Sequence, residues 1–468
     1  MIRNKNFNGK RRLLAALILL SLAITVSCTA ETTEDDPLTS VVTSQEVTEA
    51  DVITEEDLSG YAPIALIASR YTLICGSKAP EKVRIAAEDL AGKIAEAESA
   101  SLSVSTDLET EVSRLELLIG ETDRAESIEA AESLSCMDYT VRIRNGKIAI
   151  LGGSPLATVQ AVTVFTGMLF DGRIENLGSD LTYDYDYDRF FVDSLAFHTD
   201  TFVPEWADNF TPPAWMHDFD EKVFALTSQS GRITSSAHRG DVINYPENSL
   251  EAILSAIMLG ADAVEIDIRL TKDNVPVLMH DGTLTRTTNW SKKCGRNGLP
   301  KSPNIEDWTY EQLRELRLTH NGQLTDSMIP TLYEAALLFS GKAQIHFDCK
   351  VTDKIDLDTD IYPLAEETGS KSSFFYSFGY DMMVKWLRND SKDTEFKQFV
   401  KKITAYLAQN GKSLRKSKFG LLEKYGDTPQ GWRSAYNDGY KTVYTDNILL
   451  FCRFSASQQE PLEPIKLK

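Results

Sequence analysis

The chain reads AHRGDVINYPENSLEAILSAIMLGADAVEIDIRL from Ala237 to Leu270, which predicts a strand, a helix and a second strand in succession. The helix, expected over Pro246–Leu259, has apolar residues at helical spacing, Asn248 as its N-cap and Glu251 three residues later. The second strand, Ala263–Leu270, alternates between apolar and charged side chains. Two strands joined through a helix predict a parallel sheet with a right-handed crossover.

The same alternation of strands and helices continues along residues 233–456. Seven or eight strands in such a length favour an α/β fold, a compact (β/α)8 TIM-type barrel. The candidate strands are Thr234–Arg239, Ala263–Leu270, Val275–His280, Ala343–Lys350, Ser373–Phe378, Phe419–Leu422 and Thr442–Thr445, with an eighth near Ile403–Tyr406.

Charged residues share one face of the strand Ala263–Leu270. Side chains alternate along a strand, so Glu265 and Asp267 point to the same side, which we expect to be the barrel interior. A barrel interior is normally apolar, so two carboxylates there need compensation, which a bound cation provides. Asp348 and Lys350 share a face of the strand Ala343–Lys350, adding a third carboxylate and an ammonium group that could hold a phosphate.

Two histidines are expected at strand ends, where active sites of barrel enzymes lie. His238 precedes Arg239, and His280 follows the strand after Glu265 and Asp267. Two imidazoles, a guanidinium and a carboxylate pair are the groups needed to bind a divalent cation and break a phosphodiester. Oxygen ligands alone favour Ca²⁺ or Mg²⁺ over zinc.

These motifs resemble those of the glycerophosphodiester phosphodiesterase family. The matching text is "AHRGDVINYPENSLEAILSAIMLGADAVEIDIRLTKDNVPVLMHDGTLTRTT", followed by "IPTLYEAALLF", "IHFDCK" and "GYKTVYTDN". The resemblance implies a (β/α)8 barrel with His238 and His280 as the acid–base pair. It implies metal ligation by Glu265 and Asp267, with Asp348 standing where the family usually has Glu. It also places Arg239 and Lys350 at the phosphate.

The implied reaction hydrolyses a small glycerophosphodiester to sn-glycerol 3-phosphate and an alcohol. In the family the nucleophile can be the neighbouring glycerol hydroxyl, which gives a cyclic phosphate that water then opens. We assign His238 as base and His280 as acid, although the sequence cannot order the two. Two other functions stay open: a phospholipase of the same superfamily acting on intact lipid, and a surface carbohydrate- or wall-binding protein with an inert barrel.

A smaller α/β domain is predicted over residues 62–185. Glu81–Ala97 has a helical pattern, and Tyr139–Ile143 and Lys147–Leu151 flank Asn145-Gly146, which favours a hairpin. This domain resembles the non-catalytic accessory domain beside the catalytic barrels of some glycoside hydrolases. Residues 186–232 are expected to connect the two domains.

The first sixty residues are typical of export and tethering. A basic segment precedes the apolar run Leu13–Val26, which ends at Ser27-Cys28 like a bacterial lipoprotein cleavage site. We therefore expect a signal peptide over residues 1–28 and a lipid anchor on Cys28, which would make the protein extracytoplasmic and membrane-attached. Residues 29–60 form an acidic tether, because residues 31–60 hold ten acidic residues and no Lys or Arg. The net charge of −20 argues against nucleic acid as a partner.

Overall fold

The computed structural model describes residues 68–458 except 145, 172–173, 175–176, 178–179, 188–200, 229–231, 376–393, 410–418 and 421. The predicted signal peptide and tether lie outside the described residues. Among the helices that are described, none is both long and apolar enough to span a membrane.

The first sheet has six strands, as expected for a small α/β domain. Its spatial order is β2 (Val104–Thr106), β1 (Thr72–Cys75), β3 (Glu116–Ile119), β5 (Lys147–Gly152), β4 (Tyr139–Arg144) and β6 (Leu181–Tyr185). The predicted hairpin is present, because β4 and β5 pair antiparallel. The helices are α3 (Glu81–Glu98), α4 (Ala125–Ala131) and α5 (Pro155–Phe170).

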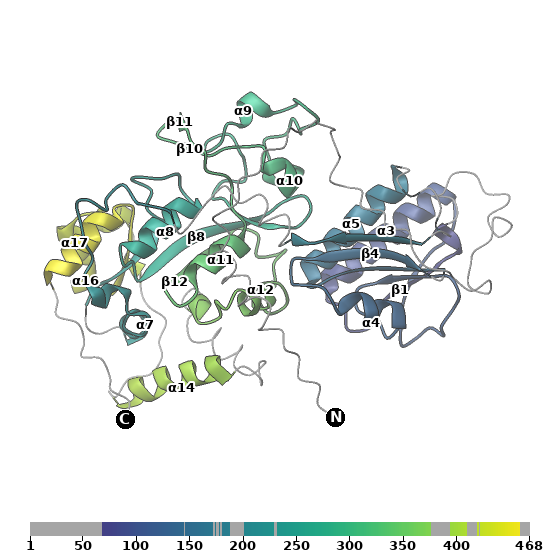
Figure 1. Cartoon of the computed structure of the whole chain (residues 1–468), viewed down its shortest axis with the longest axis horizontal. Coiled ribbons are helices and arrows are strands. Elements are labelled where there is room, and N and C mark those ends of the chain that lie inside the picture. Colours follow the sequence, from purple (N-terminus) through teal and green to yellow (C-terminus); the bar gives the residue numbers. More distant parts are fainter. Residues whose placement is uncertain are drawn as a thin grey trace, which may run out of the picture. The chain divides into compact units, whose positions relative to one another are not determined.

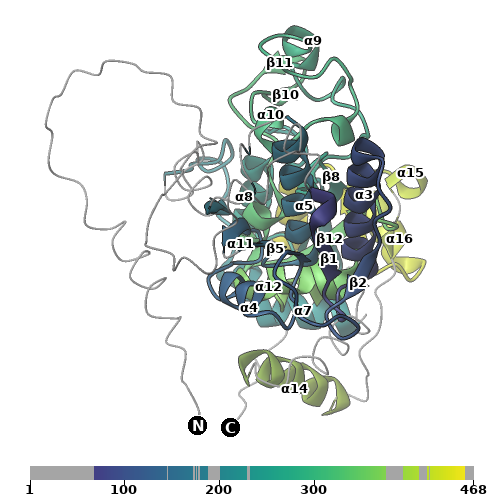
Figure 2. The ribbon, with the colours of Figure 1, turned by 90° about the vertical axis from the view of Figure 1, so that its right-hand side faces the viewer.

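Both faces of this sheet are covered by helices. On β5, Ile148 and Ile150 belong to the core formed with α3 and α5, which lie side by side in Figures 1 and 2. Ala149 and Leu151 instead pack on Ala130 of α4. Side chains alternate between the two faces of β5, and both faces are buried, so β5 is apolar at nearly every position.

The second sheet contains the residues singled out as catalytic. Its spatial order is β12 (Gln344–Cys349), β8 (Ala263–Leu270), β7 (Thr234–His238), β14 (Thr442–Thr445) and β13 (Phe419–Gly420), all paired in parallel, with β9 (Pro276–Leu278) beside β8. The longer helices are α7 (Phe219–Ser228), α8 (Leu250–Met258), α11 (Leu332–Phe339), α12 (Tyr362–Glu367), α14 (Thr394–Gln409), α16 (Pro429–Asn437) and α17 (Ile448–Gln458). Shorter elements are η2 (Ala214–His217), α9 (Trp290–Lys293), η3 (Ile305–Asp307), α10 (Tyr310–Leu313), β10 (Thr319–His320), β11 (Gln323–Leu324), η4 (Leu357–Ile361), η5 (Ser373–Phe375) and α15 (Leu422–Tyr425).

The α/β class is confirmed, and the parallel strands with helical crossovers are those of a (β/α)8 barrel. Within the described residues the five parallel strands form an open arc. Parallel strands end at the same edge, so His238, the end of β8 and the end of β12 lie together at the carboxyl edge.

The strand predicted over Val275–His280 is present as β9 but in the opposite direction, and two other strand predictions were wrong. The strand after β8 runs antiparallel to it, because a tight turn with Asn274 at a positive φ reverses the chain. Ser373–Phe375 is a 3₁₀ turn whose amides bond to Ser370, and the rest of that predicted strand lies outside the described residues. Ile403–Tyr406 lies inside α14, where Phe396, Val400 and Ile403 recur at helical spacing and are buried.

The helix predicted over Pro246–Leu259 begins later than expected. It spans Leu250–Met258, and its N-cap is Ser249, whose side chain accepts from the amide of Ala252. Asn248 is not the cap: it has a φ of 58° and its side chain turns to the strand β8.

Candidate active site

Three carboxylates meet at the carboxyl edge of the second sheet. Glu265 and Asp267 lie on β8 and Asp348 on β12, and the sheet register pairs Asp348 directly with Asp267. One oxygen from each of the three lies within 4.8 Å of the others. Glu265 and Asp267 are buried, and burial together with the charge of Asp267 raises the pKa of Glu265 to about 8. The three predicted metal ligands therefore form one acidic cluster.

Two basic side chains contact this cluster. The Nζ of Lys350 lies 2.9 Å from Oδ1 of Asp267 and 2.7 Å from Oδ2 of Asp348. The Nε of Arg239 lies 3.3 Å from Oδ2 of Asp267, and the backbone amide of Arg239 donates to Glu265. The predicted phosphate-binding residues thus lie against the predicted metal ligands, and their roles stay predictions.

Asn248 fixes the position of Asp267. Its Nδ2 donates to Oδ2 of Asp267 over 2.8 Å, and its Oδ1 accepts from the amide of Asp267 over 3.1 Å. This pair of bonds explains why Asn248 adopts the left-handed backbone conformation, which Asn tolerates better than most residues. Asn248 is therefore a positioning residue of the cluster.

His238 lies beside the cluster, at the end of β7 and in register with Glu265. Its Nδ1 lies 2.7 Å from Oδ1 of Asp446, which follows β14. Burial lowers the pKa of His238, but the hydrogen bond to Asp446 and the charge of Glu265 raise it by more, so its pKa lies above the ordinary value. A carboxylate only accepts, so Nδ1 carries the proton and Nε2 is left to face a substrate.

His280 follows β9, the strand that pairs antiparallel with the end of β8. The preceding residue, Met279, donates its amide to the carbonyl oxygen of Asp267 over 3.0 Å. The Nδ1 of His280 lies 2.7 Å from Oδ1 of Asp281, and the Nε of Arg286 donates to the other oxygen of Asp281 over 2.6 Å. That bond from Arg286 lowers the pKa of Asp281 well below its ordinary value.

A chain of ion pairs and hydrogen bonds joins Arg239 to His280. Glu247 accepts from Nη1 and Nη2 of Arg286, both at 2.7 Å, and from Nη1 of Arg239 at 3.1 Å. Arg239 is thereby linked through Glu247, Arg286 and Asp281 to His280. This network was not predicted from the sequence.

Asp446, which lies 208 residues after His238, was not predicted as a site residue either. The signal available was its place immediately after the last parallel strand, at the same sheet edge as His238. Asp281 had a clearer signal, since it follows His280 directly and was quoted only as part of a motif.

Comparison with known proteins finds a family and several relatives that this chain resembles. Residues 238–418 match the model of the glycerophosphoryl diester phosphodiesterase family. The chain is 43% identical over 124 residues to human glycerophosphodiester phosphodiesterase 1, covering 25% of this chain and 34% of the human protein. It is 36% identical over 144 residues to the glycerophosphodiester phosphodiesterase of Caldanaerobacter subterraneus, covering 30% and 53% respectively.

A solved structure with the same family name is also similar. The glycerophosphoryl diester phosphodiesterase of Parabacteroides distasonis has 22% identity and a TM-score of 0.34, covering 52% of this chain and 93% of that one. The chain thus spans between about a third and half of the two relatives named above. Its C-terminal half contains a domain of the glycerophosphoryl diester phosphodiesterase family.

Proposed function

We propose that the protein is a metal-dependent phosphodiesterase that hydrolyses glycerophosphodiesters to sn-glycerol 3-phosphate and an alcohol. The observation that carries the proposal is the cluster of Glu265, Asp267 and Asp348, flanked by two histidines that each bond a carboxylate through Nδ1. The family match over residues 238–418 and the names of the relatives support the same activity.

The acidic cluster fits a hard divalent cation, Ca²⁺ or Mg²⁺. Its donors are all carboxylate oxygens, and two of the three carboxylates are buried, where uncompensated negative charge is costly. When bound, the cation would neutralise charge on the phosphate and help to orient it. Lys350 and Arg239 touch the same carboxylates, so they are placed to bind the remaining phosphate oxygens.

The two histidines would divide the proton transfers. The Nε2 of His238 removes a proton from the attacking hydroxyl, and the new P–O bond forms as the bond to the alcohol breaks. His280 gives its proton to the departing alkoxide, and water then opens the cyclic phosphate left by attack of the neighbouring glycerol hydroxyl, with the two histidines exchanging their proton-transfer roles. The charge of Asp281 is shared with Arg286, whereas Asp446 has no basic partner besides His238 among the described residues. Asp446 is therefore better able to stabilise a protonated imidazole, which favours His238 as the base.

The experiment is to follow sn-glycerol 3-phosphate released from glycerophosphocholine by protein stripped of metal and then supplied with Mg²⁺ or Ca²⁺. We expect turnover only after a cation is added. The Asp267→Asn variant should lose both turnover and cation binding, whereas Asp326→Asn, outside the cluster, should keep both. Full turnover by demonstrably metal-free protein would refute the metal site.

We also propose that the protein is exported and anchored to a bacterial membrane through a lipid on Cys28. The support is the sequence alone: a basic segment, the apolar run Leu13–Val26, and Cys28 after it. Mass spectrometry of the mature amino terminus tests this proposal. A mature protein that retains Arg11 and Arg12 would contradict it.

A further inference from the structure

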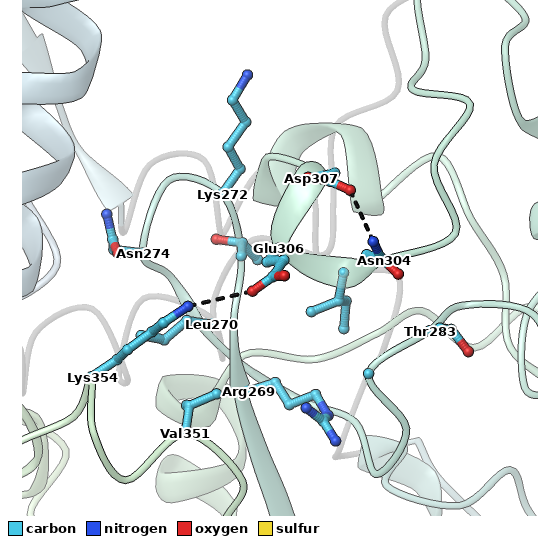
Figure 3. Close-up of a pocket in the computed structure, with 13 residues that line it drawn as sticks. Arg269, Leu270, Lys272, Asn274, Thr283, Asn304, Glu306, Asp307, Val351 and Lys354 are labelled. Carbon is cyan, nitrogen blue, oxygen red and sulfur yellow. Dashed lines mark hydrogen bonds and ion pairs between the residues drawn. The ribbon is translucent and has the colours of Figure 1, made fainter.

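A pocket of about 500 Å³ opens at the end of β8, where Arg269 and Leu270 line it (Figure 3). Its walls come from the end of β8 and the following turn, from the loop after His280, from η3, and from the loop after β12. In Figure 3, Glu306 and Lys354 face each other, and Arg269 lies below them. The roles assigned above to the cluster and the histidines do not use this pocket.

Residues of the pocket adjoin residues of the site along the chain and through hydrogen bonds. Arg269 is two residues after Asp267 on the same strand face, and its Nε and Nη2 donate to the carbonyl oxygen of His280 at 2.9 and 2.7 Å. Gly282 and Thr283 follow His280 by two and three residues and line the pocket. A group that leaves the phosphorus near His280 therefore has this pocket as its neighbour.

The walls offer donors and acceptors at several points. The Nη1 of Arg269 makes no hydrogen bond within the described residues, and Gly282 leaves it uncovered, since a Cβ there would lie 3.5 Å from this nitrogen. The side-chain amide of Asn274 also makes no hydrogen bond within the described residues, while its backbone amide donates to Thr271. Glu306 and Lys354 pair at 3.3 Å, and both are more than half exposed, so each can exchange this contact for a ligand.

We propose that this pocket binds the alcohol portion of the diester and selects a polyhydroxylated alcohol. Hydroxyl groups both donate and accept, so they match a wall that carries a guanidinium, an amide, an ammonium and a carboxylate. None of the residues that line the pocket is aromatic, whereas recognition of a quaternary ammonium group uses aromatic faces. The charged wall is equally unsuited to an acyl chain.

The proposal rests on the proposed function, and one substrate pair tests the two separately. Glycerophosphoinositol has a polyhydroxylated alcohol, whereas the ethyl ester of sn-glycerol 3-phosphate is too small to fill the pocket. The wild-type protein should have a lower KM for the inositol diester. Glu306→Ala should raise that KM by about tenfold, the loss expected for one hydrogen bond to a charged group, and leave the ethyl ester unaffected.

Glu315→Ala is the matched control. Glu315 is 63% exposed and pairs with Lys293 at 3.4 Å, much as Glu306 is 64% exposed and pairs with Lys354. If Glu306→Ala misfolds, Lys354→Met tests the same wall. The subsite proposal would be overturned if Glu306→Ala changed the KM of both substrates equally or of neither. It would also be overturned if the wild-type protein preferred diesters of choline or of a long alkyl alcohol. Failure of the wild-type protein to hydrolyse either diester would overturn the proposed function itself, and the subsite with it.

Discussion

Asp446 lies 2.7 Å from the Nδ1 of His238, and Asp446 is itself held in place by Asp427. One carboxylate oxygen of Asp427 accepts from the amides of Asp446 and Asn447, both at 2.9 Å, and the other accepts from the indole of the buried Trp432. The loop after the last parallel strand is therefore built to present Asp446 to the imidazole. Such outer partners orient a histidine and fix its tautomer.

Asp446→Asn should lower kcat by about 10–100-fold with little change in KM, because the amide keeps the size of the side chain but not its charge. Steady-state kinetics on glycerophosphocholine measure the effect. Asp438→Asn serves as control, since Asp438 precedes β14, whereas Asp446 follows it, and its side chain accepts from the Tyr425 hydroxyl. Equal activities of the two variants would show that Asp446 does not act through His238.

The two histidines should respond differently to the leaving group. Positioned proton transfer contributes ~10²–10⁴-fold, so His280→Ala should cost about this factor for choline, a poor leaving group. The cost should be much smaller for p-nitrophenolate, which needs little protonation. His238→Ala should be severe with both leaving groups, because the nucleophile still needs a base. The opposite pattern would exchange the two assignments, and two fully active variants would refute acid–base catalysis by this pair.

Lys350→Met should reduce turnover but should not weaken cation binding. The Nζ of Lys350 occupies positions beside Asp267 and Asp348, so it competes with a cation for these carboxylates. Titration calorimetry with Mg²⁺ should give an affinity equal to or higher than that of the wild-type protein. A large loss of affinity would mean that Lys350 supports the metal site rather than the phosphate.

Glu334 makes the stability of the barrel domain depend on pH. Burial raises the pKa of Glu334 from 4.5 to about 7, although its carboxylate accepts from the amide of Thr331 at the start of α11. Between these two values the folded state keeps a proton that the unfolded chain has lost, so the free energy of unfolding falls as pH rises. Above pH 7 this loss is complete.

Glu334→Gln removes the titration and keeps an acceptor for Thr331. Its stability relative to the wild-type protein should therefore improve between pH 5 and pH 8, by at most about 3 kcal/mol. Urea unfolding at both pH values measures this difference, with the exposed Glu315→Gln as reference. A difference that does not change with pH would show that Glu334 is not protonated in the folded protein.

The sequence predicted those parts of the site that depend on strand periodicity. Alternation along β8 placed Glu265 and Asp267 on one face, and parallel pairing brought Asp348 opposite Asp267. Alternation does not specify strand direction, however, so the reversal at β9 was not foreseen. The helix signal was also ambiguous, because Asn248 and Ser249 are both good N-caps, and only the contact with Asp267 decides between them.

Contacts between distant segments could not be predicted from local patterns. The pair His238 and Asp446 joins the two ends of the barrel domain, and the position of Asp446 after the last parallel strand indicates the sheet edge but not the contact. The ion pairs around Glu247 likewise depend on how the loop after His280 returns to the site. Helical periodicity, by contrast, was informative at residues 394–409, where the expected strand conflicted with a clear apolar stripe.

The most direct test of the proposed function is to identify which P–O bond is broken. Glycerophosphoinositol would be incubated with the metal-loaded protein in ¹⁸O-labelled water, and the products followed by ³¹P NMR and mass spectrometry. The account predicts sn-glycerol 3-phosphate carrying the label on phosphorus, together with unlabelled inositol. Inositol phosphate with free glycerol, or no phosphomonoester at all, would contradict it.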